Sequence, residues 1–133
     1  MNQPLRLLII EDSVDDIELL LHLLRSQGYL VASAAVDTPI SMRAALERQE
    51  WDLITCDHSM PGFSAPAALA IAKELCPDVP FIVVSGEIDL NLAVALIKLG
   101  AQDYVKKSEL IRLCPVIERE LRDAKLARQR ELA

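Results

Sequence analysis

The chain has few of the features that mark nucleic-acid-binding, secreted or membrane proteins. Only 4% of its 133 residues are aromatic and its net charge is -6, so it has neither the stacking side chains nor the basic surface of a typical nucleic-acid-binding domain. Its N-terminal apolar run, Leu5 to Ile10, is far shorter than the roughly 20 residues of a membrane span. No cleavage pattern of small residues follows this run. The sequence therefore predicts a cytoplasmic protein that binds neither DNA nor a membrane directly.

Cysteine and histidine are also scarce. The three cysteines, Cys56, Cys76 and Cys114, are odd in number and widely separated, without the C-x-x-C spacing of metal or redox sites. His22 and His58 have no second His or Cys at ligand spacing, which argues against zinc. We expect reduced, mostly buried thiols.

The residues that are present favour one folded domain of the α/β class. The composition is 52% hydrophobic and 26% charged, as in globular domains of this length. Short apolar runs alternate five times with helical patterns, which predicts a parallel sheet with helices on both faces. Ser13 with Asp16 three residues later resembles a capping box at the first helix start. The expected strands are Leu5 to Ile10, Tyr29 to Val36, Trp51 to Cys56, Phe81 to Ser85 and Tyr104 to Lys106.

Four of these runs end on residues suited to phosphoryl chemistry. In an open parallel sheet the ligand site lies beyond the carboxyl ends of the strands, so residues far apart in sequence converge there. Three carboxylates, a hydroxyl and an ammonium can bind a magnesium ion and a phosphoryl group. The residues at these ends are Glu11-Asp12, Asp57, Ser85 and Lys106-Lys107.

Each of these residues has a simpler interpretation when it is taken alone. Glu11 and Asp12 could be ordinary helix-start acids, since acids are favourable at helix N-termini. Ser85 could be a loop hydroxyl and Lys107 a solvated charge. Asp57 is harder to dismiss, because an acid that ends an apolar strand loses solvation unless it is paired or bound to metal.

Taken together and in this order, the motifs resemble the receiver domain of two-component response regulators. The resemblance covers roughly residues 5 to 125 and implies a doubly wound, flavodoxin-like sheet of strand order 2-1-3-4-5. The matching stretches are Ile9-Ile10-Glu11-Asp12, Asp57-His58-Ser59-Met60-Pro61-Gly62, Val83-Val84-Ser85-Gly86 and Gly100-Ala101-Gln102-Asp103-Tyr104-Val105-Lys106-Lys107.

The resemblance also implies a magnesium site and a phosphoryl acceptor. Asp12 would ligate Mg²⁺ directly and Glu11 mainly through water. Asp57 would be both a ligand and the phosphoryl acceptor, and the backbone carbonyl of Ser59 would complete the protein ligands.

Three further residues receive roles from the resemblance. Lys107 would neutralise the phosphoryl oxygens and pair with Asp57 beforehand, and Ser85 would donate its hydroxyl to a phosphoryl oxygen. Tyr104 would be the switch aromatic that rotates into the space Ser85 vacates, although a plain core aromatic is the alternative. Strand alternation places Lys106 on the other face, which favours Lys107 as the site lysine.

The chain departs from the family pattern at two points. Most receivers have a proline in a cis bond after the site lysine, whereas Ser108 stands here. Because a cis bond without proline costs about 3 to 4 kcal/mol, we expect a trans bond. Ser59 and Glu87 also flank the site, where they can alter the access of water.

By resemblance the chain is a phosphoacceptor rather than an enzyme, with only magnesium-assisted self-phosphorylation and self-dephosphorylation. Its expected partners are a sensor histidine kinase or phosphotransfer protein, and an output domain or partner protein. We expect the receiver in residues 1–125 and a helical extension in 126–133. This extension is either a solvated helix end or a linker to a following signalling domain or to the partner in a homodimer.

Two other functions remain open from the sequence. A phosphatase of the haloacid-dehalogenase type also uses a strand-end Asp, but its second Asp is replaced here by Ser59, and the chain lacks room for a cap domain. A binding module that signals without phosphorylation would keep the fold.

Overall fold

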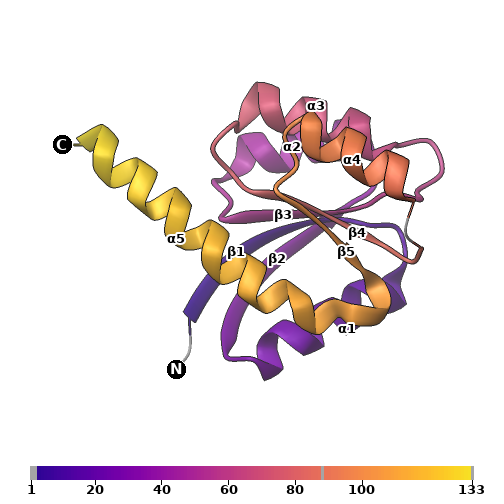
Figure 1. Cartoon of the computed structure of the whole chain (residues 1–133), viewed down its shortest axis with the longest axis horizontal. Helices are drawn as coiled ribbons and strands as arrows, with labels where there is room; N and C mark the ends of the chain where they lie inside the picture. Colours follow the sequence, from indigo (N-terminus) through magenta and orange to yellow (C-terminus); the bar gives the residue numbers. More distant parts are fainter. Residues whose placement is uncertain (1–2, 88, 133) are drawn as a thin grey trace.

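The chain forms one parallel five-stranded sheet. In the computed structural model, which describes residues 3–87 and 89–132, the strand order is β2-β1-β3-β4-β5 and every neighbouring pair is parallel (Figure 1). This confirms the predicted fold class and strand order. The strands are β1 (Gln3–Ile10), β2 (Tyr29–Val36), β3 (Leu53–Asp57), β4 (Phe81–Ser85) and β5 (Asp103–Lys106).

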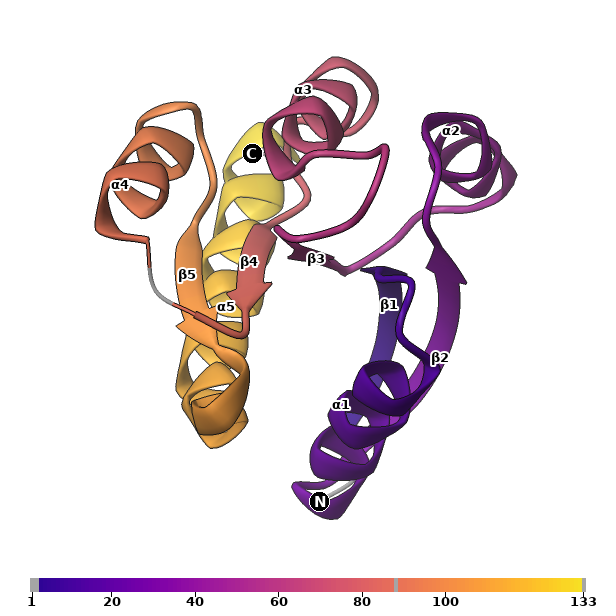
Figure 2. The same cartoon turned by 90° about the vertical axis from the view of Figure 1, so that its right-hand side faces the viewer.

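Helices cover both faces of this sheet. Helices α2, α3 and α4 pack on one face, and α1 and α5 on the other (Figures 1 and 2). Each face has its own apolar cluster, so the central strands are buried on both sides, as parallel sheets require. The helices are α1 (Val14–Ser26), α2 (Pro39–Arg48), α3 (Ala65–Leu75), α4 (Leu90–Lys98), the short 3-10 helix η1 (Lys107–Arg112) and α5 (Leu113–Leu132).

The start of α1 lies next to the polar edge of the sheet. The Ser13 hydroxyl accepts a hydrogen bond from the backbone N–H of Asp16 at 3.3 Å, which satisfies one free donor of the first turn. One of the two hydrogen bonds of the predicted capping box is therefore present. The Asp16 carboxylate binds Lys107 instead of returning to the backbone of Ser13.

Strand β3 begins and ends later than predicted. Asp52 lies just before the strand, and its carboxylate accepts from the backbone N–H of Arg6 at 2.8 Å and from its guanidinium at 2.9 Å. At the other end Asp57 still pairs with Val84 of β4. The sheet therefore includes Asp57 itself, which fixes the backbone of this acid.

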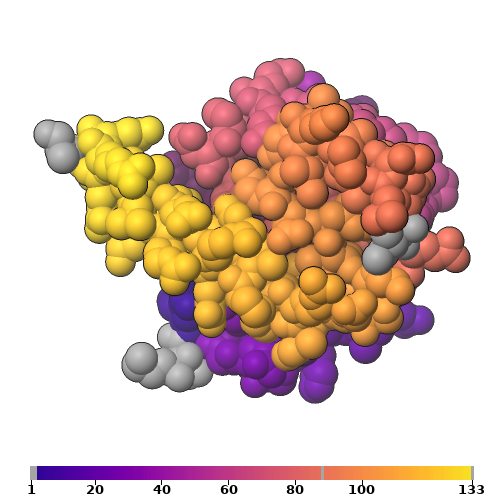
Figure 3. All heavy atoms as spheres, viewed as in Figure 1, coloured from indigo at the N-terminus to yellow at the C-terminus, as the bar shows by residue number. Residues whose placement is uncertain are grey.

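Helix α5 extends past the body of the domain (Figures 1 and 3). Leu113 and Ile117 are buried against the sheet, whereas every residue from Lys125 to Leu132 is exposed. Helix α5 is continuous from Leu113 to Leu132, so residues 126–132 of the expected extension are helical. Residues 1, 2 and 133 of the expected bounds 1–125 and 126–133 lie outside the described residues.

No helix in the described part of the chain is long and apolar enough to cross a membrane.

Candidate functional site

Three carboxylates meet at the carboxyl end of the sheet. Glu11, Asp12 and Asp57 each offer one oxygen, and these oxygens lie within 4.8 Å of one another. Glu11 is 7% exposed and Asp57 is 6% exposed, whereas Asp12 is open to solvent. A cluster of oxygen donors that is open on one side fits a hard divalent cation that keeps some of its waters.

The sheet register brings these acids together. Ile10 of β1 pairs with Cys56 of β3, so Glu11 and Asp57, the next residue after each of these, lie side by side. The carboxylate of Glu11 is fixed further, because its Oε2 accepts from the backbone N–H groups of Asp12 and Ser13 at 3.1 and 3.3 Å. Local hydrogen bonds therefore hold one acid in place before any ligand arrives.

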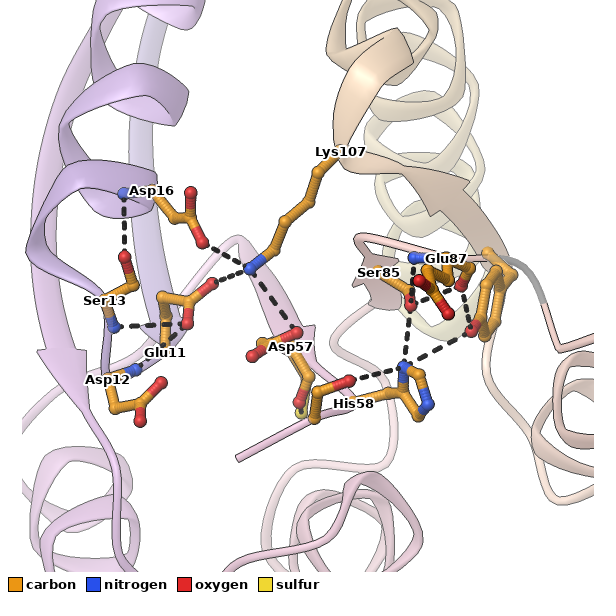
Figure 4. A network of polar contacts seen from close by, with 12 residues as sticks. Glu11, Asp12, Ser13, Asp16, Asp57, His58, Ser85, Glu87 and Lys107 are labelled. Carbon is orange, nitrogen blue, oxygen red and sulfur yellow. Dashed lines mark hydrogen bonds and ion pairs between the residues drawn. The ribbon is translucent and has the colours of Figure 1, made fainter. Parts of the chain in front are cut away.

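Lys107 reaches into this cluster, as predicted, while Lys106 stays outside it. The Nζ of Lys107 lies 2.7 Å from Glu11 Oε1, 2.6 Å from Asp16 Oδ2 and 3.5 Å from Asp57 Oδ1 (Figure 4). The expected pairing with Asp57 is therefore the longest of the three contacts. Asp16, for which the sequence predicted only a helix-capping role, thus belongs to this cluster.

In the described part of the chain, one carboxylate oxygen of Asp57 is buried without a hydrogen bond. Among the described residues its buried Oδ1 has no hydrogen-bond partner, and only the 3.5 Å ion pair with Lys107 approaches it. A buried acceptor without a hydrogen bond is costly, so this atom favours a ligand that supplies positive charge or a bond.

The electrostatics of the cluster are dominated by its acids. Burial raises the pKa of Glu11 and Asp57 adds to this, although hydrogen bonds from Lys107 and the Ser13 backbone oppose the shift. Burial disfavours the charge of Lys107, but its hydrogen bonds with Asp16 and Glu11 raise its pKa above the ordinary value. The lysine therefore stays charged, and one cation balances four nearby carboxylates.

A second polar cluster lies beside the first. The Ser85 side chain is fully buried, and its Oγ lies 2.7 Å from Nδ1 of His58 and 2.6 Å from the backbone oxygen of Glu87. The Tyr104 hydroxyl lies 3.4 Å from that Glu87 oxygen and 3.4 Å from His58 Nδ1. The two predicted switch residues are thus joined through His58, for which the sequence predicted no role beyond arguing against a zinc site.

An open cavity of about 450 Å³ lies between the two clusters. It is large enough for a phosphoryl group, and Asp57, Lys107 and the predicted flanking residues Ser59 and Glu87 all line it. Its lining consists of Asp16, Asp57, His58, Ser59, Gly86, Glu87, Asp89 and Lys107.

The loop after Lys107 follows the sequence expectation. No peptide bond is cis within residues 3–87 and 89–132, so the bond between Lys107 and Ser108 is trans. Lys107 begins η1, which carries the chain from β5 directly into α5.

Residues 7–118 match the response regulator receiver domain family. The chain belongs to this family. A receiver domain is a phosphoacceptor of two-component signalling rather than an enzyme, so the family membership decides against the phosphatase alternative.

Curated relatives share this domain but are longer. The chain is 35% identical over 104 residues to the transcriptional regulatory protein ZraR of Escherichia coli, covering 76% of this chain and 22% of ZraR. It is 32% identical over 110 residues to a protein-glutamate methylesterase/protein-glutamine glutaminase of Paramagnetospirillum magneticum, covering 80% of this chain and 31% of that protein. The receiver therefore spans less than a third of each of these two relatives.

Solved structures confirm the fold. The chain matches NtrX from Brucella abortus in complex with ADP at a TM-score of 0.85 and 27% identity, covering 97% of this chain and 30% of NtrX. The receiver domain of a putative Luxo repressor from Vibrio parahaemolyticus matches at 0.80 and 27%, covering 96% and 98%. A receiver domain of a Pseudomonas aeruginosa sensor histidine kinase, with magnesium coordinated in its active-site cleft, matches at 0.74 and 23%, covering 89% and 98%.

Proposed function

We propose that Asp57 accepts a phosphoryl group from the phosphohistidine of a sensor histidine kinase or phosphotransfer protein. One observation carries the proposal. The buried Asp57 Oδ1 has no hydrogen-bond partner among the described residues, and Asp57 and Lys107 line the same open cavity. Receiver domains pair with histidine kinases, and that cavity offers the kinase access to the acceptor.

The donor set around Asp57 fits a magnesium ion. Asp12 and Asp57 would be direct ligands, Glu11 would act mainly through water, and the backbone carbonyl of Ser59 would complete the set. The three side-chain oxygens within 4.8 Å and the hard oxygen chemistry of Mg²⁺ support this assignment. When it is bound, the ion offsets the repulsion between the acceptor carboxylate and the incoming phosphoryl oxygens.

The residues of this chain then carry out the transfer. An Asp57 carboxylate oxygen attacks phosphorus, and the bond from phosphorus to the donor nitrogen breaks as the new bond forms. Lys107 leaves Asp16 to neutralise the transferred oxygens, and Ser85 donates its hydroxyl to one of them. Hydrolysis of the acyl phosphate by water returns the domain to its starting state.

The signal would leave through Ser85 and Tyr104 toward β5 and its neighbouring helices. In receivers that carry an output domain, such a change must cross to that domain or to a partner protein. The exposed last turns of α5, from Lys125 to Leu132, support a role for residues 126–133 as a helical linker. Two apolar residues there, Leu126 and Leu132, are 44% and 89% exposed, which also favours pairing of this helix in a homodimer.

The acceptor assignment is tested by mass spectrometry. Incubation with Mg²⁺ and acetyl phosphate should add the mass of one phosphoryl group to the wild type and none to Asp57→Asn. Asp78→Asn, an exposed acid in the turn before β4, is the matched control and should label like the wild type. Label retained in Asp57→Asn would place the acceptor elsewhere, and no label on the wild type would refute the proposed function.

A further inference from the structure

Three polar groups surround the hydroxyl of Ser85. Its Oγ lies 2.6 Å from the backbone oxygen of Glu87, 2.7 Å from His58 Nδ1 and 3.3 Å from the backbone N–H of Glu87. A serine hydroxyl has one proton and two lone pairs, so these three contacts use its full hydrogen-bonding capacity.

The partners determine where the protons lie. A carbonyl oxygen can only accept, so the 2.6 Å contact with Glu87 requires the Ser85 proton to point there. Ser85 Oγ must then accept from His58, which means that His58 carries a proton on Nδ1. The same oxygen accepts the longer bond from the Glu87 N–H. The hydroxyls of Ser59 and Tyr104, 3.3 and 3.4 Å from His58 Nδ1, can then only accept from the Nδ1 proton, at longer range than Ser85.

Strand alternation explains why His58 reaches this position. Asp57 and His58 follow each other at the end of β3, so their side chains point in different directions. Figure 4 shows Asp57 directed toward Lys107 and His58 directed toward Ser85. His58 also approaches Tyr104, with ring centroids 6.2 Å apart and the Tyr104 hydroxyl 3.4 Å from Nδ1.

We propose that His58 is a positioning residue that holds Ser85 and Tyr104 in the resting arrangement. The inference rests on the proposed function, in which Ser85 donates to a phosphoryl oxygen on Asp57. To donate to the phosphoryl oxygen, the Ser85 hydroxyl must turn its only proton away from the backbone oxygen of Glu87, which accepts it in the resting network. Phosphorylation therefore has to break this bond and the bond from His58 Nδ1 before the switch can move.

The test compares variants that remove or keep the donor at the Nδ1 position. His58→Leu removes it, whereas His58→Asn keeps an amide N–H at about the same distance from the backbone. With Mg²⁺ and acetyl phosphate, His58→Leu should label about threefold to tenfold faster than the wild type, the ratio expected when one hydrogen bond no longer opposes the change. His58→Asn should label at close to the wild-type rate.

A double substitution separates positioning from general loosening of the fold. If His58 acts through the Ser85 hydroxyl, His58→Leu should change the rate little in a Ser85→Ala background. The Mg²⁺ concentration that gives half of the thermal shift should be the same in all these proteins. His58→Gln, whose amide reaches beyond the Nδ1 position, should behave as His58→Leu does and serves in its place if the leucine variant does not fold.

The outcomes distinguish the two proposals. No label on the wild type overturns the proposed function and this inference with it. If the wild type labels but His58→Leu and His58→Gln match His58→Asn in rate, only the positioning role is wrong. An acceleration that persists unchanged in the Ser85→Ala background would also overturn it.

Discussion

Lys107 should be the residue on which the stability of the metal-free acid cluster depends most. Its Nζ contacts Glu11 and Asp16 at 2.7 and 2.6 Å and lies 3.5 Å from Asp57. Lys107→Met keeps most of the alkyl stem and removes the charge. Glu11 and Asp57, each with a side chain 7% exposed, would then lie close together without a cation.

The size of the effect follows from the burial of these groups. Removing one partner of a fully buried ion pair costs several kcal/mol. Because Lys107 is 22% exposed and Asp16 is 35% exposed, solvent screens part of the interaction, and we expect a loss of about 2 to 3 kcal/mol. For a domain of this length that corresponds to a fall in the unfolding midpoint of about 6 to 15 °C.

Thermal unfolding followed by circular dichroism, with and without Mg²⁺, measures this effect. Lys106→Met is the matched control, because Lys106 is adjacent, also half-buried and, within the described residues, forms no ion pair with the acids that Lys107 contacts. Magnesium should raise the midpoint of Lys107→Met more than that of the wild type, since the ion supplies the missing positive charge. If Lys107→Met and Lys106→Met unfold at the same temperature without Mg²⁺, the stabilising role of Lys107 is wrong.

Two further predictions concern the metal site and the last helix. Asp12→Asn should raise the unfolding midpoint without Mg²⁺, because it removes one of three repelling carboxylates. The same substitution should reduce the rise in midpoint that Mg²⁺ produces. An undiminished rise would exclude Asp12 from the site. Deleting residues 125–133 should change the midpoint by less than about 2 °C, because the described residues of that segment are exposed and exposed segments contribute little stability; a larger loss would show that the helix end is part of the domain.

The sheet and the main site residues could be predicted because they depend on simple rules. Apolar runs of strand length, separated by helical patterns, determine a parallel sheet, and such a sheet brings its carboxyl ends to one edge. Residues at the ends of β1 and β3 therefore had to meet, and the three carboxylates do. The start of β3 was less predictable, because Asp52 is held by Arg6, a contact between residues 46 positions apart.

The positions of Asp16 and His58 in the site could not be predicted from the sequence, for different physical reasons. Asp16 lies three residues after Ser13, where an acid also serves as a helix cap, so its spacing does not distinguish the two roles. Only the approach of Lys107, 91 positions away, shows that its carboxylate belongs to the site.

No local sequence pattern predicts the contacts of His58. Its role depends on how Ser85 at the end of β4 and Tyr104 in β5 lie relative to the end of β3. The sheet order alone predicts that these strands are neighbours, but not that an imidazole nitrogen stands 2.7 Å from one hydroxyl and 3.4 Å from the other. Strand alternation directs the side chain that follows Asp57 away from Lys107 and toward Ser85 and Tyr104, the two proposed switch residues.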